Sequence, residues 1–316
     1  MRYLGKLITQ ARRSTDNLDG STITGNGGVG ISDNEIIQYF NDGQDRVQSL
    51  ADAEFTPIFT KTGNIATVAN QSDYDLPTDI YGTGKVSLVE FRKDSSAQFF
   101  PIRPLTPEMQ GFDSSDNTST FDGIPLGYQI RGGKLVITPT PRSNVGTYRL
   151  TYPAFVDRLD IRRGQVTSTT DDATDYLTIL LDDDVNLDNT EINANDTLSV
   201  VDKEGVMIYR NIEYTAYDQS TRVLTLASGV ALATAVISTG DYITLDRNAV
   251  THSTLPNFVE RYLITYAEWK LLVRRSSTDA AAKQTELSAI ETDISESFRQ
   301  TTHDVRRIPR ISDLWT

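Results

Sequence analysis

The residues best suited to chemistry in this chain are acidic, and they gather just after residue 181. Four oxygen-bearing side chains alternate there as at the start of a calcium loop: Asp182, Asp184, Asn186 and Asp188. Leu187 stands where such a loop needs glycine, and Asn193 where it needs a bidentate glutamate. We therefore expect a solvated acidic turn. A hydrolase using Asp182 and Asp184 stays open, because only their separation in space decides it.

Other candidate chemistries are weaker. The stretch GNGGVG at 25–30 resembles a phosphate-binding loop, but it follows helix-like sequence and no lysine comes after it. His252 and His303 have no nearby cysteine or histidine partner, and no nucleophile elbow is present. The chain contains no cysteine, which excludes disulfides and thiolate sites. We expect no catalytic residue, no metal and no cofactor.

Charge is distributed unevenly along the 316 residues. The net charge is −13, and residues 157–250 hold 7 basic against 17 acidic residues, a net of −10. Nucleic-acid binding needs a basic stripe, so this segment is a poor DNA-binding surface. No run approaches the roughly 20 apolar residues of a membrane span, and the N-terminus lacks the features of a secretion signal, so we expect no membrane contact.

Helical periodicity occurs at both ends of the chain. Residues 2–14 and 32–53 read as helices, the second with a capping box of Ser32 and Glu35 and weakened by Gly43. Two more follow Pro256, which we place in a first turn. Their apolar stripes predict a helix-packing or oligomer seam formed by Ile36, Phe40, Phe258, Tyr262, Tyr266, Trp269, Leu287, Ile294 and Phe298.

The middle of the chain changes to a period of two. Alternating segments such as KVSLVEF, KLVIT and TYRLTY predict a small antiparallel β domain. Five further short strands, YLTILL, DTLSVVD, VMIYRNIEYTAY, RVLTLA and DYITLD, predict a second, inserted barrel or sandwich. The fold class is α+β. We expect five segments: helices 1–60 packing with 254–304, a β domain 61–156, an inserted acidic β domain 157–250, helices 251–304, and an arm 305–316.

Two short stretches look like structural devices. Pro77 forces Leu76 into an extended form, so that Tyr74 and Leu76 can bury under the helices while Asp79 stays at the surface or caps a turn. The end of the chain cannot stay helical across a proline, and its basic and apolar residues predict an arm that docks on another subunit: Arg306, Arg307, Ile308, Pro309, Arg310, Ile311, Leu314 and Trp315.

The order of these signals resembles the head-to-tail adaptor, or connector, proteins of short-tailed bacteriophages. The resemblance covers roughly residues 30–156 and 254–300, and no single motif in it is specific. It rests on an ordered series: Tyr74, Leu76, Pro77 and Asp79; Pro125 and Tyr128; Leu135, Pro139 and Pro141; Tyr148, Leu150 and Tyr152; and Leu255 with Pro256. Residues 157–250 depart from the pattern as an extra inserted β domain.

This resemblance implies a structural protein without enzyme activity. It implies a homo-oligomeric, twelve-fold ring beneath the portal protein that joins the head to the tail or nozzle, with fibre proteins as further neighbours. DNA would pass through the lumen without sequence-specific binding, and the arm would dock on the portal. The expected location is the head–tail junction of the virion, after assembly in the host cytoplasm.

One alternative comes from the inserted segment itself. Tyr209, Tyr214 and Tyr217 lie near acidic residues there, which would suit a tail-associated module that binds a host surface or a glycan. Glycan-array binding by the isolated segment would favour that hypothesis.

Overall fold

The computed structural model describes residues 3–15, 31–54, 57–82, 85–106, 125–141, 144, 146–172, 175–182, 197–227, 237–245 and 248–305. The chain forms two compact units. The first comprises Met1–Leu50 and Val156–Phe298, and the second comprises Ala51–Phe155 and the chain from Arg299 onward. The division into five segments stays a prediction.

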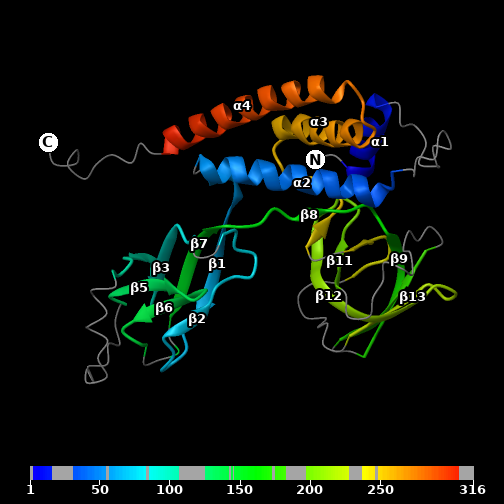
Figure 1. Ribbon diagram of the computed structural model, residues 1–316. Helices are drawn as coiled ribbons and strands as arrows, with labels where there is room; N and C mark the ends of the chain where they lie inside the picture. Colours follow the sequence, from blue (N-terminus) through cyan, green and yellow to red (C-terminus); the bar gives the residue numbers. More distant parts are fainter. Residues whose placement is uncertain are drawn as a thin grey trace. The chain divides into compact units, whose positions relative to one another are not determined.

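The first unit contains a layer of helices (Figure 1). Its members are α1 (Leu4–Ser14), α2 (Asp33–Ala53), α3 (Asn257–Arg274) and α4 (Ala280–Val305), except that α2 from Ala51 and α4 from Arg299 are assigned to the second unit. The apolar stripe of α1 is buried as its spacing requires, since Leu4, Leu7 and Ala11 are fully covered. Pro256 is the N-cap of α3 and so lies one position before the predicted first turn.

Gly43 allows α2 and α3 to approach closely. A Cβ atom at this position would lie 3.2 Å from Leu263 and 3.4 Å from Tyr266. Glycine in a helix costs about 1 kcal/mol relative to alanine. In α2 the absence of a side chain at Gly43 makes room for α3, which explains why α2 contains a glycine at this position.

The first unit also contains a closed antiparallel β barrel. Its order is β10-β13-β12-β11-β14-β9, with bounds β9 (Gly164–Asp171), β10 (Tyr176–Leu181), β11 (Thr197–Val201), β12 (Met207–Asp218), β13 (Val223–Leu226) and β14 (Tyr242–Leu245). Beside it, β8 (Arg158–Leu159) pairs in parallel with β15 (Ala249–Val250). The α+β fold class with a small barrel is confirmed.

One barrel strand was missing from the sequence prediction. Strand β9 pairs with both β10 and β14 and thereby closes the barrel. Its sequence GQVTSTTD contains a single large apolar residue, Val166, and most of its later residues are exposed. A strand that buries so little has no alternating pattern to detect.

The second unit is a two-sheet β domain. One sheet has the order β1-β7-β3-β4, formed by β1 (Thr60–Ala66), β7 (Thr147–Pro153), β3 (Leu88–Arg92) and β4 (Phe100–Ile102). The other has the order β2-β6-β5, formed by β2 (Asp73–Asp75), β6 (Lys134–Thr138) and β5 (Gly127–Arg131). A short 3-10 helix, η1 (Pro57–Phe59), precedes β1. Buried aromatic and aliphatic residues of both sheets form one core.

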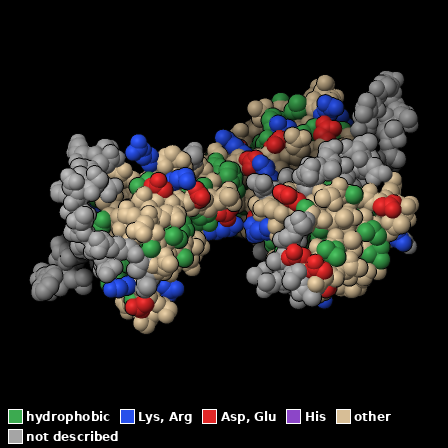
Figure 2. Space-filling model, turned by 90° about the horizontal axis from the view of Figure 1, so that it is seen from below, with side chains coloured by type: hydrophobic (Ala, Val, Ile, Leu, Met, Phe, Trp, Pro, Cys, Tyr) green, Lys and Arg blue, Asp and Glu red, His purple; other side chains and the backbone are tan. Residues whose placement is uncertain are grey.

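The surface carries charges of both signs. On the face drawn in Figure 2, basic and acidic side chains lie among one another, with hydrophobic side chains in small groups between them. Within the described ranges, no helix combines the length and the apolarity needed to cross a membrane.

Candidate functional site: the helical layer and its junction with the barrel

Most of the predicted seam residues lie inside the helical layer of one chain. Six of them are buried: Ile36, Phe40, Tyr262, Leu287, Ile294 and Phe298. Tyr266 and Trp269 are half-buried, and Phe258 is 49% exposed although its ring lies 6.0 Å from that of Phe298. A side chain covered by its own chain cannot also contact a neighbour, so any role in an oligomer falls on the exposed members. That role stays a prediction.

Glu291 connects three helices. Its carboxylate accepts two hydrogen bonds from Arg46 of α2, at 3.0 and 2.9 Å, and one of 2.8 Å from the hydroxyl of Tyr262 in α3. The hydrogen bonds from Arg46 lower the pKa of Glu291 below its ordinary value of 4.5, against the opposing effect of burial. Tyr262 is fully buried, and burial followed by its bond to Glu291 raises its pKa.

A second set of polar contacts attaches α1. Arg12 is buried and donates to the carbonyl of Ile31 at 3.0 Å and to Asp33 at 2.6 Å. Glu268 of α3 is also buried and receives Lys283 of α4 at 2.7 Å. The Ser14 hydroxyl donates to the same carboxylate. The two ends of the chain therefore hold each other through charge-assisted hydrogen bonds.

The start of α2 only partly matches its predicted capping box. The Ser32 hydroxyl accepts the backbone N–H of Glu35 at 3.2 Å, as an N-cap should. The Glu35 carboxylate instead accepts the hydroxyl of Tyr39 at 2.5 Å and lies 3.6 Å from Arg274. Burial and this bond to Glu35 raise the pKa of Tyr39 to about 12.

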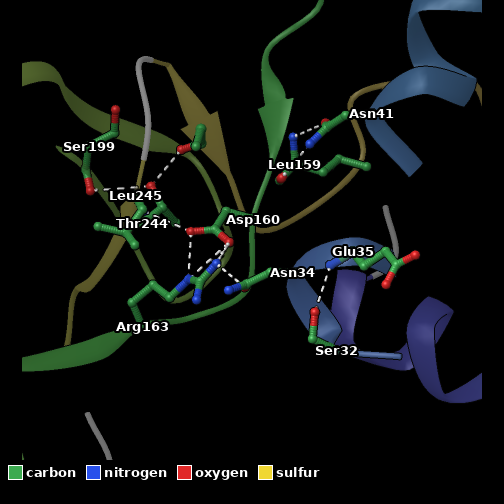
Figure 3. A network of polar contacts seen from close by, with 11 residues as sticks. Ser32, Asn34, Glu35, Asn41, Leu159, Asp160, Arg163, Ser199, Thr244 and Leu245 are labelled. Atoms are coloured by element: carbon green, nitrogen blue, oxygen red, sulfur yellow. Dashed lines mark hydrogen bonds and ion pairs between the residues drawn. The ribbon is translucent and has the colours of Figure 1, made fainter. Parts of the chain in front are cut away.

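A buried ion pair joins the helical layer to the barrel (Figure 3). Arg163 donates three hydrogen bonds of 2.7 to 3.0 Å to the carboxylate of Asp160, and both residues are about 95% buried. The same guanidinium donates to Asn34 at the start of α2, at 2.8 Å. Asp160 accepts the backbone N–H of Leu245 in β14 at 2.8 Å. One pair thus connects the helix, the strand and the segment between them.

The segment that carries this pair is aligned along α2 by further polar contacts. Asn41 donates to the carbonyl of Leu159 at 3.0 Å and accepts its N–H at 2.8 Å, so the side-chain amide acts as a neighbouring strand would. Gln48 accepts the N–H of Val156 at 3.2 Å. Asn34, Asn41 and Gln48 are spaced seven residues apart, which places them on one face of the helix.

Burial has a clear electrostatic effect at this pair. Burial raises the pKa of Asp160, while Arg163 and the backbone amides of Leu245 and Ile161 act against that rise. Removing water from two charges is costly, and the pair is tolerated because every partner is in place. The pair therefore favours one docked arrangement of the segment rather than adding net stability.

The predicted start of the β domain lies in the second unit. Tyr74 is buried in the β-domain core, with its ring 5.2 Å from Tyr148, and Leu76 packs against the same core. The expectation that they bury under the helices is wrong, because β2 pairs with β6 and directs Tyr74 into the space between the sheets. Pro77 lies beside Gly63 of β1.

Asp79 lies in a turn, is half-buried, and is paired with two side chains. Its carboxylate accepts Lys61 at 3.1 Å and the Tyr152 hydroxyl at 2.9 Å. Burial raises the pKa of Asp79, but the hydrogen bonds from Tyr152 and Lys61 outweigh it, so the pKa is lowered overall. Asp79 therefore fixes the chain at the point where it enters the sheet layer.

Among the described residues, the side chains considered for catalysis or metal binding do not come together in one site. Asp182 accepts the N–H of Gln165 at 3.1 Å, whereas residues 183–196 and the loop 25–30 lie outside the described residues. His252 stacks against Tyr3 with ring centroids 5.7 Å apart, and burial followed by the charge of Arg162 lowers its pKa. Among the described residues, no group of three or more His, Cys, Asp or Glu side chains could hold a metal ion.

The remaining predicted sites have different outcomes. The arm residues 306–316 lie outside the described part of the chain, and so does the side chain of His303. Tyr214 is buried in the barrel core, and Tyr209 and Tyr217 pack against that core. The ring of Tyr214 is therefore unavailable to a ligand, whereas Tyr209 and Tyr217 are half-buried, and glycan binding through them stays a prediction.

The sequence interpretation missed the junction altogether. Asp160 and Arg163 stand three residues apart beside Leu159 and Ile161, and that mixture of charge and apolar residues was the available signal. The polar residues at intervals of seven along α2 were a second sequence signal for this junction.

Replacing Asp160 by Asn should lower the free energy of unfolding of the first unit by roughly 3 kcal/mol, because Arg163 then loses its buried counter-charge. Urea unfolding followed by Trp269 fluorescence and far-UV circular dichroism measures this. Arg210→Gln is the control, since its pair with Asp157 is partly exposed and should cost less than about 1 kcal/mol. Equal losses in the two variants would contradict the role given to the pair.

Stability should also depend on pH through Glu291. Its pKa is lowered in the folded chain, so its contribution is present above about pH 4.5 and is lost as the pH falls through the folded value. Glu291→Gln should reduce the fall in melting temperature between pH 6 and pH 3, because Gln cannot titrate. The exposed Glu204→Gln serves as control and should leave the curve unchanged. Superimposable curves for wild type and Glu291→Gln would rule the contribution out.

Comparisons with known proteins complete the description. A family model described as SU10 adaptor protein matches residues 2–188, from α1 through β10. No match was found among curated proteins. One solved structure, the flagellar cap protein FliD D1-D2-D3 domains from Escherichia coli, is matched at 12% identity over 82% of this chain and 75% of that chain. Its TM-score of 0.09 means that the folds do not superimpose, so it carries no argument.

Proposed function

Since the chain belongs to the SU10 adaptor family of bacteriophages, we propose that it forms a twelve-fold ring below the portal, joins the head to the tail and lets DNA pass. Membership in the family makes it a structural component of the virion at the head–tail junction, where it interacts with portal and tail proteins. The short-tailed type, the assembly in the host cytoplasm and the absence of enzyme activity belong to the proposal.

The observation that carries the proposal is the family match over residues 2–188, which is more than half of the 316 residues. It includes the first two helices and the whole β domain, where the ordered motifs occur. The match extends past residue 157 into β9 and β10, which belong to the segment predicted to be an insertion. The start of an inserted domain at residue 157 is therefore a proposal.

Net charge supports the passage of DNA. Twelve copies of a chain with net charge −13 carry −156 in one assembly. Duplex DNA carries one negative charge per roughly 1.7 Å of its axis. At a screening length of about 8 Å, acidic groups near a narrow lumen still repel it. Repulsion keeps the genome from adhering to the wall, which a conduit requires.

The C-terminal arm supplies the proposed attachment to the portal. Its residues combine basic and apolar side chains after the last helix, as in Arg306, Ile308 and Trp315. A partner with an acidic, apolar surface could pair with the arginines and bury the apolar side chains of such a segment. The barrel, on this proposal, faces tail or fibre proteins.

Deleting residues 305–316 should leave a folded chain that does not join the portal. Native mass spectrometry of the protein, alone and mixed with purified portal, measures this. The full chain should be a monomer alone and a ring of twelve on the portal. A length-matched variant with Arg306, Arg307 and Arg310 replaced by Gln separates charge from length and should bind more weakly than wild type. Normal assembly of the truncated chain would exclude the arm, and a full chain that never forms a ring would overturn the proposed function.

A further inference from the structure

The four-stranded sheet of the second unit presents one face that its core does not cover. Tyr148, Leu150 and Tyr152 of β7 are buried in the core, so Thr147, Arg149 and Thr151 point to the opposite face. The pairing register places Glu90 opposite Arg149 and Leu88 opposite Thr151 on that outer face. On β1, the outer residues Thr62, Asn64 and Ala66 are exposed.

Two guanidinium groups stack on one aromatic ring at this face. Arg149 lies 4.0 Å and Arg92 lies 4.8 Å from the centroid of Phe99. Glu90 accepts the Nε of Arg149 at 2.7 Å. The Nε of Arg92 is buried, and no hydrogen-bond partner among the described residues reaches it. Glu90 pairs with Arg149, and no ion pair of Arg92 is found among the described residues, so the two arginines and one carboxylate sum to one positive charge.

Within the sheet the stack has apolar and neutral neighbours, and the charged pair Lys93 and Asp94 follows Arg92 in the chain. Leu88 is 39% exposed, and Pro101 is exposed beside it. The nearest outer-face residues on β7 are the threonines 147 and 151. Arginine and aromatic residues are enriched at the centres of protein–protein interfaces, where their charge and ring are desolvated together. The face therefore has the composition of a contact surface for another protein.

Charge complementarity indicates which protein would cover it. Copies of a chain with net charge −13 repel one another, so contact between copies requires a face that is locally positive. A phosphate backbone would need a row of cations, whereas here Glu90 pairs with Arg149 and Asp94 follows Lys93. We propose that this face binds a carboxylate-bearing surface of a second copy of the chain, with Arg92 as the residue that takes the carboxylate. The inference rests on the proposed ring.

Charge reversal tests the proposal in the full chain. Arg92→Glu should reduce the fraction of ring formed with purified portal at least tenfold by mass photometry, because like charges would then meet in the interface. Arg131→Glu is the matched control, since it removes the same charge from an exposed position on the other sheet and should assemble as wild type. If wild type forms rings and Arg92→Glu forms them equally well, this inference fails while the proposed function stands.

Crosslinking provides a second readout that does not require the Arg92→Glu variant to fold. The chain has no cysteine, so Leu88→Cys can carry a single benzophenone label at an exposed position. Illumination of the assembled ring should join two copies, and peptide mapping should place the second attachment site in an acidic surface. An assembled ring that yields no copy-to-copy product from this position would overturn the proposal. So would wild-type binding to a 30-base-pair duplex that Arg92→Gln weakens while assembly is unchanged. If wild type forms no ring at all, the proposed function fails first and the inference with it.

Discussion

The buried contact between Asp160 and Arg163 is the constraint on which the first unit depends. It lies where an α-helix, a barrel strand and an extended segment converge, and each of these supplies one partner. Buried charges gain little over apolar side chains of similar size, but they tolerate only one arrangement, because any displaced partner leaves a charge without solvent or counter-charge. The helical layer and the barrel are consequently held in one register rather than merely in contact.

In the helical layer, too, carboxylates with several partners fix the arrangement of the elements, although these carboxylates are less buried than Asp160. Glu291 receives partners from two other helices, and Glu268 receives partners from α1 and α4. The apolar stripes supply most of the driving force for packing, since burial of a large aliphatic or aromatic side chain stabilises by roughly 1.5 to 3 kcal/mol. The carboxylates then select which helix faces which. For a structural component such as an adaptor, this selection matters more than extra stability.

The helical ends, the α+β class and the small barrel could be predicted from the sequence because each depends on a local period. Strand β9 could not, because a strand of threonine and serine is specified by its two neighbours rather than by its own pattern. The burial of Tyr74 in the β domain rather than under the helices depended on the pairing of β2 with β6, which no spacing reveals. The spacing of Asp160 and Arg163 was visible in the sequence, but the strand partner of Asp160, the backbone N–H of Leu245, lies 85 residues away, and single-sequence reasoning has no access to such a pair.

Closure of the barrel has a consequence for an assembly of many copies. An open sheet ends in strands whose backbone N–H and C=O groups are free to pair with those of another molecule, and such pairing is the usual beginning of aggregation. Strands β9 and β10 pair with each other and complete the cylinder, so every described strand of the barrel has a neighbouring strand on both sides. In the ring proposed above, closed barrels of neighbouring copies would present no sheet edge through which the copies could polymerise.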